Sequence, residues 1–122
     1  MRAGKVSSNI QQAILLITSL RASWYEPDCG KLVWGPVATG HEKPAGADYV
    51  SCHDTYDAID LVVNDKNGYT SAECTSMFLT RIKEGGVANA TEVMICDETN
   101  FDDVTPHIHI YDTNCSSSCR TH

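Results

Sequence analysis

The stretch TPHIHIYDTNCSSSCRTH, residues 105–122, combines the two features that decide the fold: an alternating strand pattern and two closely spaced cysteines. In an extended chain successive side chains point to opposite faces, so HIHIY places His107, His109 and Tyr111 on one face and the two isoleucines on the other. We therefore expect a strand over about 104–111 that leads into a cysteine-containing tail.

The spacing of the six cysteines indicates disulfides. Zinc motifs cluster their ligands in closely spaced cysteine pairs, and only Cys115 and Cys119 come near this spacing. Disulfides need an oxidising compartment, so the sequence predicts a secreted, extracellular protein whose two C-terminal cysteines bridge back into the body. The pairing stays open for the six residues, which are Cys29, Cys52, Cys74, Cys96, Cys115 and Cys119.

The same tail has an alternative interpretation as a zinc site. Its C-x3-C-x2-H pattern offers Cys115, Cys119 and His122 as ligands if the thiols are reduced. A fourth ligand would then come from His107 or His109. This alternative describes a reduced, zinc-binding interaction domain.

The histidine pair has its own alternatives. Imidazoles two residues apart on a strand can chelate a metal, and a third ligand could come from His122, Asp102 or Asp103. Strand alternation alone explains His107 and His109 as the polar face of a half-buried strand. We therefore predict no bound metal.

Length and composition limit the class of protein. A chain of 122 residues with 42% hydrophobic and 20% charged residues is typical of one globular domain, covering residues 1–122. A net charge of −7 with nine basic residues gives no basic stripe, so nucleic acid is not an expected partner. The chain has no P-loop and no dinucleotide fingerprint, which excludes the usual nucleotide cofactors, and no apolar run approaches the ~20 residues of a membrane span.

The N-terminal segment resembles a signal peptide in outline, with a basic start and the apolar run AILLITSL. The run is short, however, and the polar SSNIQQ precedes it. We expect that a leader was removed ahead of this segment and that residues 8–21 form a helix of the folded domain. Its broad apolar face should lie on a sheet, or else on a second copy of the chain in a homodimer.

Two more helices are expected from capping signals and apolar stripes at helical spacing, over about 51–63 and 71–84. The short β-branched run AIDLVV leaves a strand as the alternative for the first of these. KLVWGPVATG has strand character, GHEKPAGAD (40–48) has the composition of a surface loop, and ATEVMIC predicts a closing strand over about 90–96.

Helices and antiparallel strands in separate runs predict an α+β fold: a small disulfide-stabilised domain with two or three helices packed on one face of an antiparallel sheet. Aromatic residues in turn-rich surroundings are candidate binding groups, and these are Trp24, Tyr25 and Trp34. Together with His107, His109 and Tyr111 they form the predicted binding set. The acidic residues Asp97, Glu98, Asp102 and Asp103 are expected in a solvated loop.

The function that these features favour is a non-enzymatic secreted protein, of effector, toxin or ligand type, that binds an extracellular protein or glycan. A small secreted hydrolase is the alternative, with an acid/histidine site drawn from His53, His107, His109 and nearby carboxylates. His53 and Asp54 are adjacent, and neighbouring helical side chains point apart, so this pair is expected at a surface or helix cap.

Overall fold

The computed structural model describes residues 6–35, 52, 53 and 55–120. The loop predicted over 40–48 lies outside these residues, as do Asp54 and His122. The described chain has three helices and four strands. In chain order they are α1 (Ser8–Ser23), β1 (Cys29–Trp34), β2 (Ala58–Asp65), α2 (Ser71–Glu84), α3 (Val87–Thr91), β3 (Val93–Glu98) and β4 (His107–Asp112).

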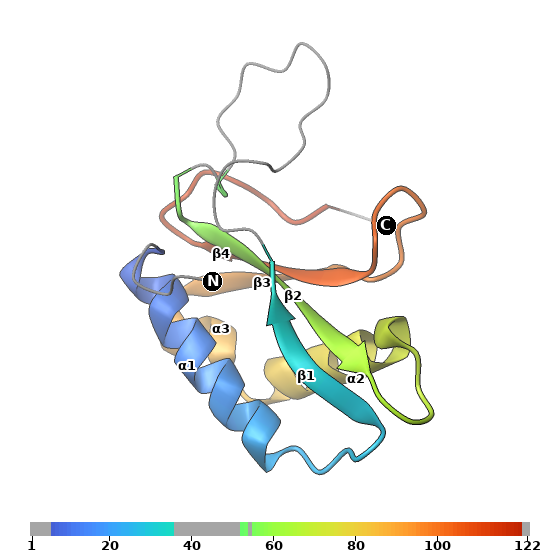
Figure 1. Cartoon of the computed structure of the whole chain (residues 1–122). Coiled ribbons are helices and arrows are strands. Elements are labelled where there is room, and N and C mark those ends of the chain that lie inside the picture. The colour runs from blue at the N-terminus through green and yellow to red at the C-terminus, as the bar shows by residue number, and fades with distance from the viewer. Residues whose placement is uncertain (1–5, 36–51, 54, 121–122) are drawn as a thin grey trace.

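The four strands form one antiparallel sheet in the order β1-β2-β4-β3 (Figure 1). β2 and β3 both pair antiparallel with β4, so they run parallel to each other, and α2 and α3 make the connection between them. Asp60 on β2 lies directly opposite His109 on β4, which in turn lies opposite Cys96 on β3. This register brings three polar or sulfur-containing side chains into one row across the sheet.

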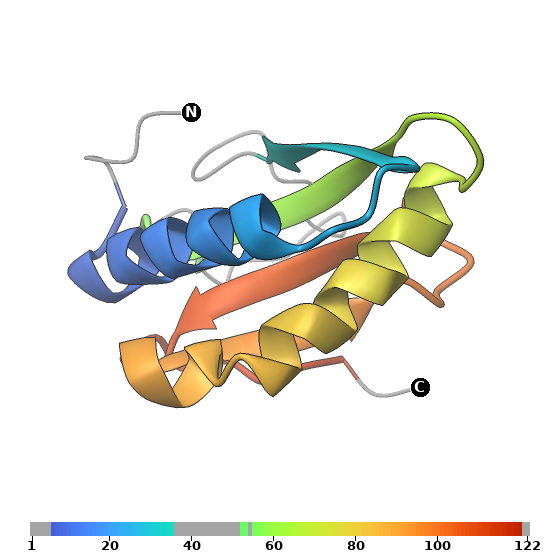
Figure 2. The ribbon, with the colours of Figure 1, turned by 90° about the horizontal axis from the view of Figure 1, so that it is seen from below.

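All three helices lie on the same side of the sheet (Figure 2). The core forms between them, and the largest of its completely buried side chains are Phe78, Ile10, Ile17, Ile59, Leu61, Ile82, Ile108 and Ile110. The small α+β domain with helices on one face, expected from the sequence, is therefore confirmed. α3 was not predicted; Gly86, at φ 67°, separates it from α2 in a left-handed conformation that suits glycine.

The helix predicted over 51–63 is wrong. Residues 58–63 belong to β2, as the alternative interpretation of AIDLVV allowed, and burial alternates with a period of two over residues 59–63. Ile59, Leu61 and Val63 are buried in the core, while Asp60 points to the other face with the histidines. A positive φ of 63° at Tyr56 also interrupts any helix before this strand. Pairing with β1 and β4 and burial of one face therefore decided a short run that periodicity left open.

The N-terminal helix begins at the predicted residue and extends two residues beyond the predicted end. Ser7 caps it by accepting a hydrogen bond from the Ile10 amide. Its buried residues pack into the core of its own chain, although Leu15 is 65% exposed. The apolar face that suggested a homodimer is thus largely used within the monomer.

Three disulfides join the six cysteines: Cys29–Cys74, Cys52–Cys115 and Cys96–Cys119. The prediction that Cys115 and Cys119 bridge back into the body is confirmed. These two bridges hold the C-terminal segment over the outer face of the sheet, where they pack with Ala58 and Tyr111. Among the described residues, no helix is long and apolar enough to cross a membrane.

Candidate functional site

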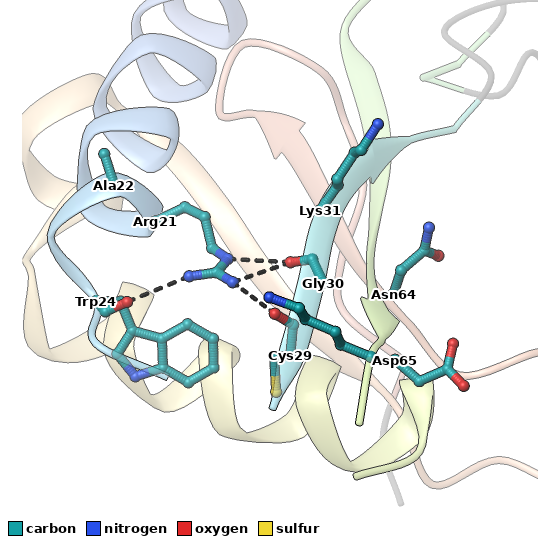
Figure 3. A pocket seen from close by; sticks show the side chains of 9 residues that line it. Arg21, Ala22, Trp24, Cys29, Gly30, Lys31, Asn64 and Asp65 are labelled. Carbon is teal, nitrogen blue, oxygen red and sulfur yellow. Dashed lines mark hydrogen bonds between the residues drawn. The ribbon is translucent and has the colours of Figure 1, made fainter. Parts of the chain in front are cut away.

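A hollow of about 720 Å³ lies between the end of α1 and the start of β1 (Figure 3). We call it the basic pocket, because three of its lining residues are cationic and one is acidic. Its lining consists of Arg21, Ala22, Trp24, Cys29, Gly30, Lys31, Asn64, Asp65 and Lys66. The side chains of Lys31 and Lys66 are exposed, so their charges face solvent.

Arg21 ties the two walls of the basic pocket together. Its guanidinium donates hydrogen bonds to the carbonyl oxygens of Trp24, Cys29 and Gly30, at 2.9–3.2 Å. It also lies over the Trp24 ring, 5.0 Å from the ring centroid, in a cation–π arrangement. Most of its donors are therefore engaged within the protein, which makes Arg21 a structural cation in this pocket.

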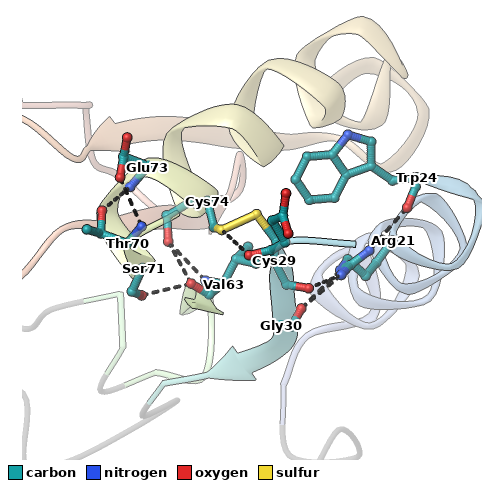
Figure 4. The surroundings of a disulfide bond; sticks show 11 residues. Arg21, Trp24, Cys29, Gly30, Val63, Thr70, Ser71, Glu73 and Cys74 are labelled. Carbon is teal, nitrogen blue, oxygen red and sulfur yellow. Dashed lines mark hydrogen bonds between the residues drawn. A yellow bond between two sulfur atoms is a disulfide. The ribbon is translucent and has the colours of Figure 1, made fainter. Parts of the chain in front are cut away.

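The floor of the basic pocket is fixed by the Cys29–Cys74 disulfide, which joins β1 to α2 (Figure 4). The first turn of α2 carries a complete capping box, in which Thr70 accepts from the Glu73 amide and Glu73 accepts from the Thr70 amide. Thr75 accepts a further hydrogen bond from the Val63 amide at 3.0 Å. The disulfide thus connects the Cys29 side of the pocket to the capped first turn of α2.

The predicted aromatic residues lie in different places. Trp24 lines the basic pocket and packs on Phe78, with ring centroids 5.1 Å apart. Tyr25 follows it with 93% of its surface exposed. Trp34 lies at the other end of β1, where it is half-buried against the core. The structure therefore brings Trp24 and Tyr25 to one surface and leaves Trp34 apart from them.

A second polar site lies on the outer face of the sheet, and we call it the histidine cluster. Three imidazoles converge on one oxygen, Oδ1 of Asp60: the distances are 3.0 Å from His109 Nδ1, 3.4 Å from His53 Nε2 and 3.9 Å from His107 Nε2. His107 Nε2 also lies 3.6 Å from Glu98 Oε1. The residues come from β2, β3, β4 and the segment before β2, so only the folded chain assembles them.

The histidine cluster changes the acidity of Asp60. Burial by itself raises the pKa of this carboxyl group, but hydrogen bonds from His109 and His53 and the electrostatic attraction of His53 and His107 outweigh it. The net result is a pKa held well below its usual range. Asp60 therefore presents a carboxylate to the three imidazoles over the whole physiological pH range.

Several sequence-based placements need correction here. His53, expected at a surface or cap, is only 1% exposed. Glu98, expected in a solvated loop, belongs to β3 and contacts His107. Asp103, considered as a third metal ligand, instead pairs with Arg120 at 2.8 Å. Asp60 was missed altogether because its segment was assigned to a helix.

Tyr111 shares the face of His109, with ring centroids 5.8 Å apart, as the alternation predicted. It is buried, however, and its hydroxyl donates to the Ser117 carbonyl in the C-terminal segment. The tail thus covers this member of the predicted binding set.

The reduced zinc domain is contradicted by the structure. Cys115 and Cys119 both form disulfides, and no cysteine of the chain is free. A disulfide sulfur lacks the thiolate that zinc ligation needs.

Fold and cysteines together define the class: a small, cysteine-rich α+β domain of extracellular type, stabilised by three disulfides. Comparison with protein-family models, with curated proteins and with solved structures finds no match to this chain. The two sites themselves are therefore the basis on which a function is inferred.

Proposed function

We propose that this is a secreted, non-enzymatic binding protein of effector or ligand type that recognises an acidic extracellular glycan at the basic pocket. The observation that carries the proposal is the lining of that pocket, which combines an aromatic ring, exposed lysines and an adjacent amide and carboxylate. Three disulfides and the two-walled, cross-linked pocket support a rigid site in an oxidising environment.

Each lining group has a role that suits a sugar acid. Lys31 and Lys66 pair with carboxylate or sulfate groups, while Asn64 and Asp65 exchange hydrogen bonds with hydroxyl groups. Trp24 contributes apolar contact at the pocket wall, and the exposed Tyr25 ring lies next to it in the chain. Arg21 keeps these groups in place because its guanidinium is bonded to the surrounding carbonyl groups.

The net charge of −7 should make such a site favour short acidic ligands over long ones. Long polyanions are repelled by the rest of the surface, whereas a short acidic oligosaccharide meets mainly the local lysines. Binding by the basic pocket should therefore weaken steeply as salt concentration rises.

The test is calorimetric titration with uronic-acid oligosaccharides of defined length. The double variant K31E/K66E should lower affinity at least about 10-fold, because two attractive charges near the ligand become repulsive. K83E is the matched control, since Lys83 is an exposed lysine on α2 outside the pocket lining. Equal weakening by K83E, or binding to neutral oligosaccharides alone, would contradict the proposal.

A homodimer is not needed for this proposal, because the apolar residues of α1 pack within the chain. The basic pocket is formed by one copy.

A second candidate function, the small hydrolase, is favoured by one observation: the histidine cluster combines three imidazoles with two carboxylates. His107 and Glu98 are each partly exposed and would act as the acid/base pair. A panel of ester and glycoside substrates tests this, with H107Q and E98Q expected to remove any activity found. Turnover that survives both substitutions would place the chemistry elsewhere.

A further inference from the structure

We propose that His53, Asp60 and His109 form a binding site for a divalent transition metal, with Zn²⁺ as the fitting ion. This inference is independent of glycan binding. Asp60 and Asp65 are five residues apart on β2, so the site lies roughly 16 Å along the strand from the basic pocket.

The spacing of the ligand atoms fits one ion. Zinc binds imidazole nitrogen and carboxylate oxygen at about 2.0–2.2 Å, so two ligands of one tetrahedral ion lie roughly 3.3 Å apart. Asp60 Oδ1 is 3.0 Å from His109 Nδ1 and 3.4 Å from His53 Nε2. All three ligand atoms lie within 4.8 Å of one another. A small rotation of one imidazole would bring the ligand nitrogens of His53 and His109 to the separation that one ion requires.

The fold holds these three residues in place before any ion binds. Asp60 and His109 are direct cross-strand partners, so their Cβ atoms are set close together by the sheet. His53 follows Cys52, which is tied to Cys115 by a disulfide, and its side chain is 1% exposed. Asp60 and His109 are 15% and 14% exposed, which leaves access for an ion and a small ligand.

The ligand chemistry selects the class of ion. Two imidazoles and one carboxylate suit Zn²⁺ and similar transition metals, whereas Ca²⁺ and Mg²⁺ prefer sites made of oxygen ligands alone. Three protein ligands leave a coordination position for water or a bound group, as in zinc sites that are not purely structural.

His107 and Glu98 belong to the surroundings of the site. His107 Nδ1 lies 2.7 Å from the Thr105 carbonyl, to which it donates as Nδ1–H, so Nε2 is the ring nitrogen that faces the carboxylates of Asp60 and Glu98. A cation held by Asp60 would lie beside this nitrogen, which is 3.9 Å from Asp60 Oδ1. His107 is therefore a positioning residue beside the ion in this proposal.

The experiment is titration of Zn²⁺ into the oxidised, chelator-treated full chain, followed by calorimetry and by thermal unfolding. We expect one ion per chain and a rise in Tm with zinc concentration. Substitution of Co²⁺ should give the visible absorption bands of a four-coordinate site. No uptake by the wild-type chain, or equal stabilisation by Ca²⁺, would overturn the proposal.

Variants assign the ligands. D60N and H109Q should each lower zinc affinity at least about 10-fold, since the loss of a ligand exceeds the effect of an outer residue. H107Q should still bind one ion, and E84Q should bind as the wild type does, because Glu84 is an exposed carboxylate on α2, on the helical side of the sheet. Far-ultraviolet circular dichroism of each metal-free variant checks that it is folded. Loss of binding in E84Q, with D60N unaffected, would refute the assigned site.

Discussion

At the scale of single residues, Asp112 shows how one buried carboxylate stabilises this fold. It lies at the end of β4 and accepts hydrogen bonds from Ser7, Asn9 and the Asn114 amide, at 2.6–3.1 Å. Burial raises the pKa of Asp112, but these hydrogen bonds more than offset it and leave the pKa below its ordinary value of 3.8. The carboxylate therefore joins the last strand to the first turn of α1.

This gives a prediction for acid stability. A carboxyl group whose folded pKa is lowered contributes its full stability above its unfolded pKa and loses it as pH falls below about 3.8. D112N should lower the free energy of unfolding at pH 7 by about 1–3 kcal/mol and flatten its decline in acid. Urea denaturation from pH 7 to pH 2 measures both effects. The exposed control D102N should keep the wild-type slope; a D112N profile as steep as the wild type would contradict this role.

Residue-scale prediction from the sequence succeeded where a local pattern was sufficient. Alternation alone placed His107, His109 and Tyr111 on one face, and the structure agrees. It failed for His53, because nothing local shows that a segment tied by a disulfide will bury its imidazole against Asp60. Such a contact depends on the fold and on the cysteine pairing, which the sequence left open.

At the scale of elements, a helix with a capping box was predictable from the sequence, whereas the secondary structure of a short apolar run was not. α2 spans the predicted residues because Thr70 and Glu73 form a capping box before an apolar stripe. The β2 segment was assigned to a helix because a run as short as AIDLVV is compatible with both the helical period of 3.6 residues and the strand period of two. This segment forms a strand because it pairs with β1 and β4, which are distant from it in sequence.

The capping box of α2 carries an element-scale prediction. T70A removes the hydrogen bond to the Glu73 amide and should lower the free energy of unfolding by about 1 kcal/mol. T80A is the matched control, because Thr80 is exposed in the middle of the same helix and alanine is the better helix former there. Guanidinium denaturation distinguishes the two; equal destabilisation by T80A would mean that the cap is not the cause.

At the scale of the whole molecule, disulfides organise both faces of the sheet. Cys29–Cys74 fixes the helical side beside the basic pocket. Cys52–Cys115 and Cys96–Cys119 hold the C-terminal segment and the segment of His53 on the outer face. A covalent frame of this kind gives a chain of 122 residues stability beyond its hydrophobic core.

The two disulfides that hold the C-terminal segment, Cys52–Cys115 and Cys96–Cys119, can be compared directly. Their cysteines are separated by 63 and 23 residues, so C52A/C115A should cost more stability than C96A/C119A. We expect about 4 and about 3 kcal/mol in the chain-entropy treatment of closed loops. Reversible chemical denaturation of each double variant measures the cost. Variants as stable as the wild type would show that the tail is pinned without its disulfides.

The six cysteines of this extracellular-type domain form three specific disulfides. Disulfide mapping tests this pairing: the native protein is alkylated without reduction, digested, and its linked peptides are identified by mass spectrometry. We expect no alkylated cysteine and only the pairs Cys29–Cys74, Cys52–Cys115 and Cys96–Cys119. Alkylated cysteines in the freshly isolated protein, or a different pairing, would contradict it.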